Sequence, residues 1–302
     1  MSSLAKKMSF GRLSEGAVKL LCLGAALFSI LITAGILYVL LSDAFVFFRD
    51  VAGPDKFFFG TSWQPNAYEP KYGVLPLVTG TLMITFGSLL ISVPLGLFSA
   101  IYLSEYAPIR VKQILKPTLE LLAGVPTVVY GYFALVTVTP ALRSLGWNVD
   151  FQNGAAGAIV VGIMTLPLIS SMCEDALTAV PSGLREAAYG LGSTKVEVTM
   201  KIVVPAALSG IVASFILAIS RAIGETMAVT LAAGYRPTMD WNFGASIQTM
   251  TATIVNLSKG DLDRGDPAYQ TIFAVGATLF FVTLGLNLIA QRIVRKFRRI
   301  GG

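Results

Sequence analysis

The stretch SGLREAAYGLGSTKVEVTMKIVVP at residues 182–205 is polar and separates two long apolar segments. It opens with helix-forming residues, and Gly190 or Gly192 suits the left-handed conformation that ends a helix. Thr194 and Glu197 have the spacing of a capping box, in which a hydroxyl and a carboxylate satisfy free amides at a helix start. The stretch therefore predicts a short helix, a glycine turn and a second helix that leads into the next apolar segment.

The composition indicates a membrane protein. Of the 302 residues, 54% are apolar and only 13% are charged, and the mean hydropathy is +0.71. A helix needs about 20 mostly apolar residues to cross ~30 Å of hydrocarbon, because its backbone polar groups must be bonded within the helix. We therefore expect an all-α integral membrane protein with six transmembrane helices, at residues 20–41, 74–104, 121–142, 151–173, 202–235 and 267–291.

The distribution of basic residues predicts the orientation. Run 20–41 is longer than the apolar part of a typical signal peptide and lacks a persuasive cleavage site, so we expect it to remain as an anchor. Most Lys and Arg residues fall on the side of the two tails and of the loops at 105–117 and 174–205, and cytoplasmic loops carry such an excess. Both termini should then be cytoplasmic. The net charge of +6 fits a basic tail beside anionic membrane lipid and needs no nucleic-acid partner.

Several classes of protein are excluded by residues that the chain lacks. It contains no histidine, which excludes histidine-based catalysis and the usual imidazole metal sites. Cys22 and Cys173 both lie in apolar runs, so we expect no disulfide. Residues 190–195 hold Gly, Thr and Lys in the wrong order for a phosphate-binding loop. We expect a protein that is not an enzyme and that binds no cofactor or metal itself.

Arg221 and Glu225 interrupt the run at 202–235. If one helix extends from about residue 206 to 234, Arg221 lies near the bilayer centre, where a charge costs about 2.5 to 3.5 kcal/mol on insertion scales. A spacing of four places the two side chains on one helix face, close enough to neutralise each other. Three roles remain open: Arg221 binds a passing oxyanion, the pair forms a gate that an anion opens by competing with Glu225, or the pair is a structural ion pair.

The loop resembles the EAA loop of ATP-binding-cassette (ABC) importer permeases. In that family pattern, EAA is followed by three residues, a glycine, nine residues and then I-x-L-P. The matching residues, with no gap in the spacing, are Glu186, Ala187, Ala188, Gly192, Ile202 and Pro205. Val204 departs from the pattern, since it replaces Leu. Such a loop is what a membrane subunit offers to a separate ATPase.

Two further stretches are similar to phosphate permeases. SRAIGETMA at 220–228 looks like the RAxGET segment of phosphate-transport permeases, and FFGTSWQP at 58–65 resembles a sequence typical of the PstC branch of that family. With GTLMIT at 80–85, the resemblance extends from about residue 57 to the end of the chain. It implies an importer of inorganic phosphate.

The resemblance also implies the type I ABC importer permease fold and a set of partners in the cell (inner) membrane. The partners are a PstA-like permease that forms a heterodimer with this chain, two ATPase subunits that bind ATP and Mg²⁺, and an extracytoplasmic phosphate-binding protein. The ATPase would contact Glu186, Ala187, Ala188 and Gly192. The substrate pathway or its gate would include Arg221, Glu225 and Thr226.

We expect one membrane domain. Residues 1–72 hold the N-terminal tail, the first transmembrane helix and an outer loop. Residues 73–292 form the permease core with the cytoplasmic loop at 174–205, and residues 293–302 form the basic cytoplasmic tail.

Alternatives remain open. A permease for another oxyanion, such as sulfate or molybdate, would keep the EAA loop, and only the RAxGET and TSWQP stretches argue against it. An ATP-independent anion channel or carrier would need neither the loop nor an ATPase. The aromatic residues of the outer loop either anchor it at the membrane interface, which we favour, or contact the binding protein; they are Phe57, Phe58, Phe59 and Trp63.

Overall fold

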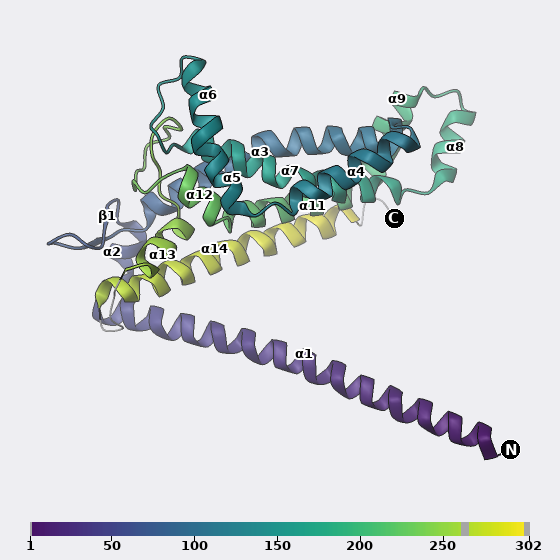
Figure 1. Ribbon diagram of the computed structural model, residues 1–302, viewed down its shortest axis with the longest axis horizontal. Coiled ribbons are helices and arrows are strands. Elements are labelled where there is room, and N and C mark those ends of the chain that lie inside the picture. Colours follow the sequence, from purple (N-terminus) through teal and green to yellow (C-terminus); the bar gives the residue numbers. More distant parts are fainter. Residues whose placement is uncertain (1, 261–265, 299–302) are drawn as a thin grey trace.

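The computed structural model describes the backbone of residues 2–260 and 266–298 and the side chains of residues 15–260 and 266–292. The predicted basic tail at 293–302 therefore lies outside the described side chains. Figure 1 shows long helices with shorter helices around them. The long helices are α1 (Ser2–Asp50), α3 (Leu75–Ile101), α7 (Gly154–Thr178) and α14 (Pro267–Arg298).

The shorter elements form the outer loop, two bent spans and the loop at residues 182–198. On the side of the outer loop are α2 (Pro54–Phe59), β1 (Trp63–Gln64), β2 (Lys71–Tyr72) and α13 (Met250–Ser258). The first bent span and the π-helical turn before it comprise η1 (Tyr102–Tyr106), α4 (Ile109–Ala123), α5 (Thr127–Phe133), η2 (Ala134–Val138) and α6 (Thr139–Ser144). The second region comprises α8 (Ser182–Gly190), α9 (Lys195–Val198), η3 (Thr199–Val203), α10 (Val204–Ala206), α11 (Leu208–Ile223) and α12 (Met227–Ala232).

The described part of the chain holds up to six spans, if each bent pair of helices counts as one. Four helices are long and apolar enough to cross a membrane, and the two bent pairs, α4 with α5–α6 and α9–α10 with α11, turn by 90° and 68° at their breaks. The six-helix prediction is confirmed in this form. The single helix expected at about 206–234 is wrong, because α11 ends at Ile223 and α12 begins at Met227. Gly224 weakens the helix at that point.

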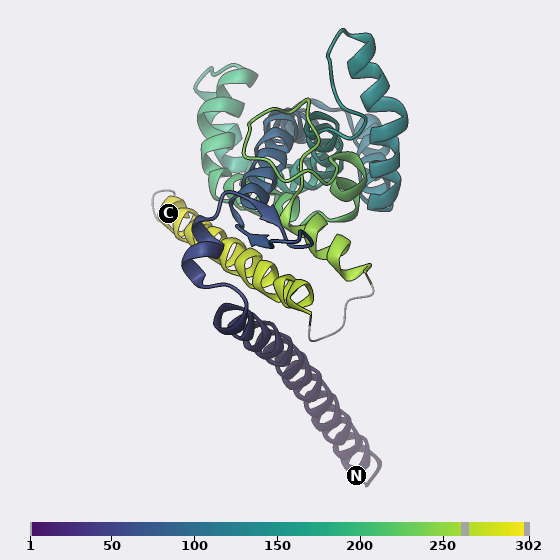
Figure 2. The ribbon, with the colours of Figure 1, turned by 90° about the vertical axis from the view of Figure 1, so that its left-hand side faces the viewer.

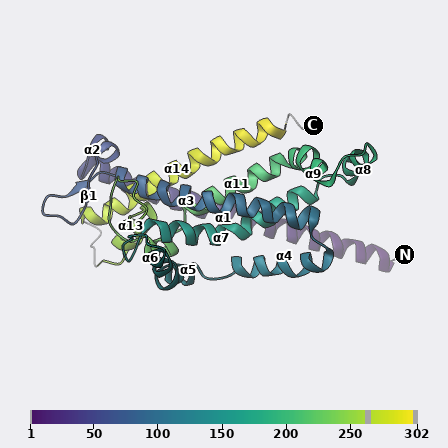
Figure 3. The ribbon, with the colours of Figure 1, turned by 90° about the horizontal axis from the view of Figure 1, so that it is seen from above.

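The centre of the molecule is the pair α3 and α7, which lie side by side in Figure 3. Glycines allow their backbones to approach closely. A Cβ at Gly162 of α7 would lie 3.0 Å from the carbonyl oxygen of Ser88 in α3, and one at Gly96 of α3 would lie 2.7 Å from the side chain of Ile169. The two helices therefore form a tightly packed unit on which the bent spans rest.

Helix α1 is attached differently from the other long helices. Its C-terminal part packs against α14, and its residues 15–36 are exposed and project away from the rest of the chain (Figures 1 and 2). The start of α1 and the end of α14 point toward the end of the molecule that carries α8 and α9, and the β1–β2 hairpin lies at the opposite end (Figure 3).

The outer loop has a core of its own. Phe57 and Trp63 are buried there, and Phe57 stacks edge-to-face on Phe47 with ring centroids 5.5 Å apart. The expectation that all four aromatic residues anchor the loop at the membrane interface is therefore wrong for Phe57 and Trp63, because both are buried in an apolar cluster of this chain. Phe58 and Phe59 are exposed.

Candidate functional site

The loop at residues 182–205 folds as the sequence predicts. Gly192 ends the first helical stretch with φ +82°, a conformation that glycine adopts without strain, and Gly190 is the last residue of α8. Thr194 and Glu197 form the capping box: the Thr194 amide donates to Glu197 Oε2 at 3.1 Å, and the Glu197 amide donates to Thr194 Oγ1. We call the helix–turn–helix unit from Ser182 to Val198 the knob.

The residues expected to bind a partner divide between two faces of the knob. Glu186, Ala187 and Gly192 are exposed, whereas Ala188 is only 4% exposed and packs in an apolar cluster of this chain. Successive helical residues point about 100° apart, so the two alanines cannot face the same partner. The small size of Ala188 lets α8 approach its own chain closely, which differs from the partner contact expected of it.

The knob also carries exposed apolar side chains, which the sequence reasoning missed. Leu184, Tyr189 and Leu191 are exposed, and Leu191 reaches 88%. An exposed apolar patch with a polar rim is typical of a protein-binding surface. The available signal was the occurrence of leucines in an otherwise polar loop.

Arg221 and Glu225 lie on either side of the break between α11 and α12. Arg221 occupies the last turn of α11 and is exposed. Glu225 is 8% exposed, and its carboxylate accepts a hydrogen bond from the amide of Ala228 at 3.2 Å, at the start of α12. Among the described residues, Arg221 makes no ion pair or side-chain hydrogen bond with Glu225 or any other residue. The expected pairing on one helix face is therefore wrong, because the helix ends between the two residues.

Polar groups satisfy the backbone where the spans are broken. Thr251 donates to the carbonyl oxygen of Glu225 at 2.8 Å, and Thr226, which is half-buried, donates to that of Gly224 at 3.0 Å. Between α4 and α5, the Tyr130 hydroxyl donates across the break to the Leu122 carbonyl at 2.8 Å. Irregular backbone at membrane depth is tolerated where it is buried in protein or lines a cavity.

The two breaks lie next to each other. Helix α5 packs on α12 so closely that a Cβ at Gly131 would lie 3.0 Å from the carbonyl oxygen of Ala228. Tyr130, Ala222 and Ala228 share one apolar cluster. The sequence thus brings two broken helices and an uncompensated arginine to one region, which we call the central break (residues 124–131 and 221–230).

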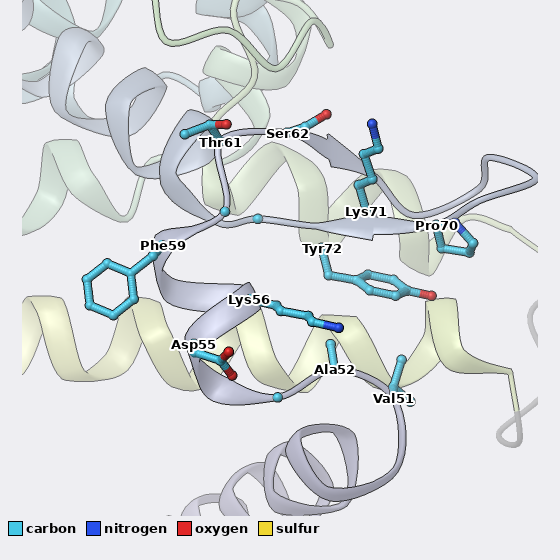
Figure 4. A pocket seen from close by; sticks show the side chains of 13 residues that line it. Val51, Ala52, Asp55, Lys56, Phe59, Thr61, Ser62, Pro70, Lys71 and Tyr72 are labelled. Atoms are coloured by element: carbon cyan, nitrogen blue, oxygen red, sulfur yellow. The ribbon is translucent and has the colours of Figure 1, made fainter.

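A separate cavity of about 790 Å³ lies in the outer loop and is lined by residues of α2 and the hairpin. In Figure 4, the side chains of Lys56 and Tyr72 lie on one side of the hairpin strand and that of Lys71 points to the other side. The two lysines therefore do not converge on a common anion. Burial raises the pKa of Tyr72, and the carboxylate of Asp266 raises it further, so this hydroxyl stays a neutral donor.

Comparisons of sequence identify the family. Residues 92–299 match the family described as the binding-protein-dependent transport system inner membrane component. The probable ABC transporter permease protein YqgH of Bacillus subtilis is 34% identical over 82% of this chain and 79% of its own length. The phosphate transport system permease proteins PstC of Mesorhizobium japonicum and Xylella fastidiosa are 34% and 30% identical, over 80% and 91% of this chain and 79% and 92% of their own lengths.

Solved structures show the same fold. A chain of the bacterial alginate ABC transporter, in complex with an alginate pentasaccharide-bound periplasmic protein, aligns with a TM-score of 0.63 at 18% identity, over 91% of this chain and 94% of its own. A chain of the inward-facing MetNI methionine ABC transporter aligns with a TM-score of 0.54 at 17% identity, over 74% and 94%. These neighbours establish the type I ABC importer permease fold. The chain therefore belongs to the family of binding-protein-dependent transport system inner membrane components, and it is a multi-pass permease rather than an enzyme.

Proposed function

We propose that this chain is a permease subunit of an ATP-driven importer of inorganic phosphate, with both termini in the cytoplasm. The observation that carries the proposal is Arg221, an exposed guanidinium at a break in a span with no partner among the described residues. An unpaired charge at membrane depth needs a water-filled cavity or a counter-anion, and the planar fork of arginine matches the oxygens of phosphate. The similarity to PstC proteins supports phosphate as that anion.

The neighbouring residues suit a transient anion site. The Glu225 carboxylate accepts a hydrogen bond from the Ala228 amide at the start of α12, so it does not form an ion pair with Arg221. Its negative charge nevertheless lies only four residues from Arg221 in the sequence. Conduction requires binding that is strong enough for entry and weak enough for release. Arg221 attracts the oxyanion, Glu225 limits how tightly it is held, and the Thr226 hydroxyl stands beside them as a further polar group of the pathway or its gate.

The proposed partners would bind at the two ends of the molecule and beside the exposed Arg221. A second, PstA-like permease encloses Arg221 and completes the pathway as a heterodimer. An ATPase pair contacts the knob around Glu186, Ala187 and Gly192, and it binds the ATP and Mg²⁺ that this chain does not bind. An extracytoplasmic phosphate-binding protein delivers the anion at the hairpin end. ATP-driven closure of the ATPases moves the knobs, and differential contacts in the two states expose the pathway to either side.

Another oxyanion is the second candidate substrate, because a guanidinium on its own binds sulfate or molybdate as well as phosphate. The resemblances of residues 58–65 and 220–228 and the similarity to PstC proteins favour phosphate over these anions. An ATP-independent channel or carrier is disfavoured, since the exposed apolar side chains of the knob would then have no partner to bind.

The experiment is uptake of radiolabelled phosphate by vesicles that contain the complete four-component complex, with ATP at the ATPase side. Arg221→Gln should assemble but lose transport, and Glu186→Lys should lose ATPase association. Arg236→Gln in the exposed outer segment and Glu15→Lys in α1 are matched controls that should behave as the native protein does. Uptake without ATP would refute the importer, and suppression of uptake by excess sulfate or molybdate would refute phosphate specificity.

A further inference from the structure

Arg185 precedes Glu186 in α8, but its side chain turns away from the exposed face of the knob. One guanidinium nitrogen donates to Glu105 Oε1 at 3.0 Å and to the Leu177 carbonyl at 2.8 Å, and another donates to the Val180 carbonyl. The Arg185 side chain is 19% exposed and that of Glu105 is 7% exposed. The contact therefore joins α8 to the end of α7 and to the π-helical turn η1 at the end of α3.

A second contact joins the other half of the knob to the same turn. The Lys195 ammonium of α9 lies 4.7 Å from the ring centroid of Tyr106, which is the last residue of η1. A cation over an aromatic face is attracted by the ring quadrupole. Both helices of the knob thus contact η1 through a charged side chain, and π-helical turns of this kind often occur at functional sites.

The backbone segments before and after α8 do not hold its orientation relative to α3 and α7. The helix has nine residues, it follows the Val180–Pro181 link, and it ends in the Gly192 turn. Side-chain contacts must therefore hold its orientation. The turn η1 continues directly from the end of α3. Helix α3 packs closely on α7 through Gly96 and Gly162, so a displacement of η1 moves the central helix pair.

We infer that Arg185 is a positioning residue for energy coupling, and that its ion pair with Glu105 is one of the contacts through which movement of the knob reaches α3. This inference rests on the proposed function, in which the knob binds the ATPase. Charge-assisted hydrogen bonds between poorly exposed groups are strong and directional, so loss of the pair weakens the attachment of α8 to the end of α3, and the Lys195–Tyr106 contact and the packing of Ala188 remain. ATP hydrolysis then continues while transport falls.

The test measures phosphate uptake per ATP hydrolysed by the reconstituted complex. Arg185→Gln and Glu105→Gln should each lower this ratio about 10-fold, which lies within the usual range of coupling between sites, and both should retain ATPase association. The double variant should be no worse than Arg185→Gln alone, because that substitution already removes the contact with Glu105 as well as the hydrogen bonds to the Leu177 and Val180 carbonyls. The charge exchange, Arg185→Glu with Glu105→Arg, should restore part of the ratio.

The matched control is Lys201→Gln, which removes the exposed Lys201–Glu197 ion pair (3.1 Å) at the end of the knob and should leave the ratio unchanged. An unchanged ratio in Arg185→Gln would overturn the inference, and so would additive losses in the double variant. Loss of ATPase association in Arg185→Gln would also overturn it, because Arg185 would then be a docking contact for the ATPase. Failure of the native complex to couple ATP to phosphate uptake would instead refute the proposed function.

Discussion

Replacement of Gly192 by alanine isolates the contribution of backbone conformation to the knob. Gly192 has φ +82°, and a Cβ added there would meet no atom within 4 Å. The whole cost therefore comes from placing an L-residue in the left-handed region, which is about 1–2 kcal/mol. The turn also orients two backbone hydrogen bonds: the Gly192 amide donates to the Tyr189 carbonyl at 2.9 Å, and the Ser193 amide donates to the Ala188 carbonyl at 3.1 Å.

A cost of about 1–2 kcal/mol corresponds to a factor of about 5–30 in an equilibrium constant. If the ATPase binds only the native turn, Gly192→Ala should weaken its association by up to that factor, as measured by titration of the ATPase against the reconstituted permease pair. Gly192→Asn should be milder, because asparagine tolerates the left-handed region.

Gly190 provides the matched control. It ends α8 in the helical conformation, and a Cβ there would also meet no atom within 4 Å. Gly190→Ala should therefore leave ATPase association unchanged or strengthen it. Equal effects of the two alanine substitutions would refute the reasoning, since their surroundings are alike and only their backbone conformations differ.

Three further predictions concern the packing of the chain. Gly162→Leu should lower the yield of folded protein in detergent, because its Cβ already meets the backbone of α3, whereas Gly285→Leu, with open space around it, should not. Glu174→Gln should cost about 1.5–3 kcal/mol of stability, because two partly exposed lysines lose their charge-assisted bonds to the buried carboxylate. Thermal unfolding should show a smaller effect for Asp175→Asn, whose side chain is exposed, and equal shifts would contradict this. Trp63→Ala should cost about 3–5 kcal/mol in the outer-loop core and expose that loop to proteolysis, and unchanged cleavage would argue against a folded outer core.

Local signals predicted the loop at residues 182–205 well. The left-handed glycine and the capping box of Thr194 and Glu197 depend on residues close together in the chain, so sequence spacing specifies them. The six apolar runs were equally predictable, because the bilayer imposes a minimum length on each crossing.

The breaks within two of those runs could not be found in the same way. The run at 202–235 satisfies the length rule whether or not the helix ends at Ile223, and the end depends on Glu225 serving the start of α12 rather than pairing with Arg221. The face that Ala188 presents, and the contact of Arg185 with Glu105, depend on how α8 docks onto α3 and α7. Such long-range contacts leave no period or spacing in the sequence.

The central break has a consequence for the barrier to conformational change. A continuous helix that bends in mid-membrane must give up backbone hydrogen bonds, each worth about 1 kcal/mol net and more where no water replaces it. Here the amides of Gly224 and Glu225 still bond back to α11, but the Ala228 amide bonds to the Glu225 carboxylate and not to a carbonyl of α11. Helix α12 therefore begins with a cap of its own, and a change in its angle to α11 at Gly224 interrupts no continuous run of helical hydrogen bonds.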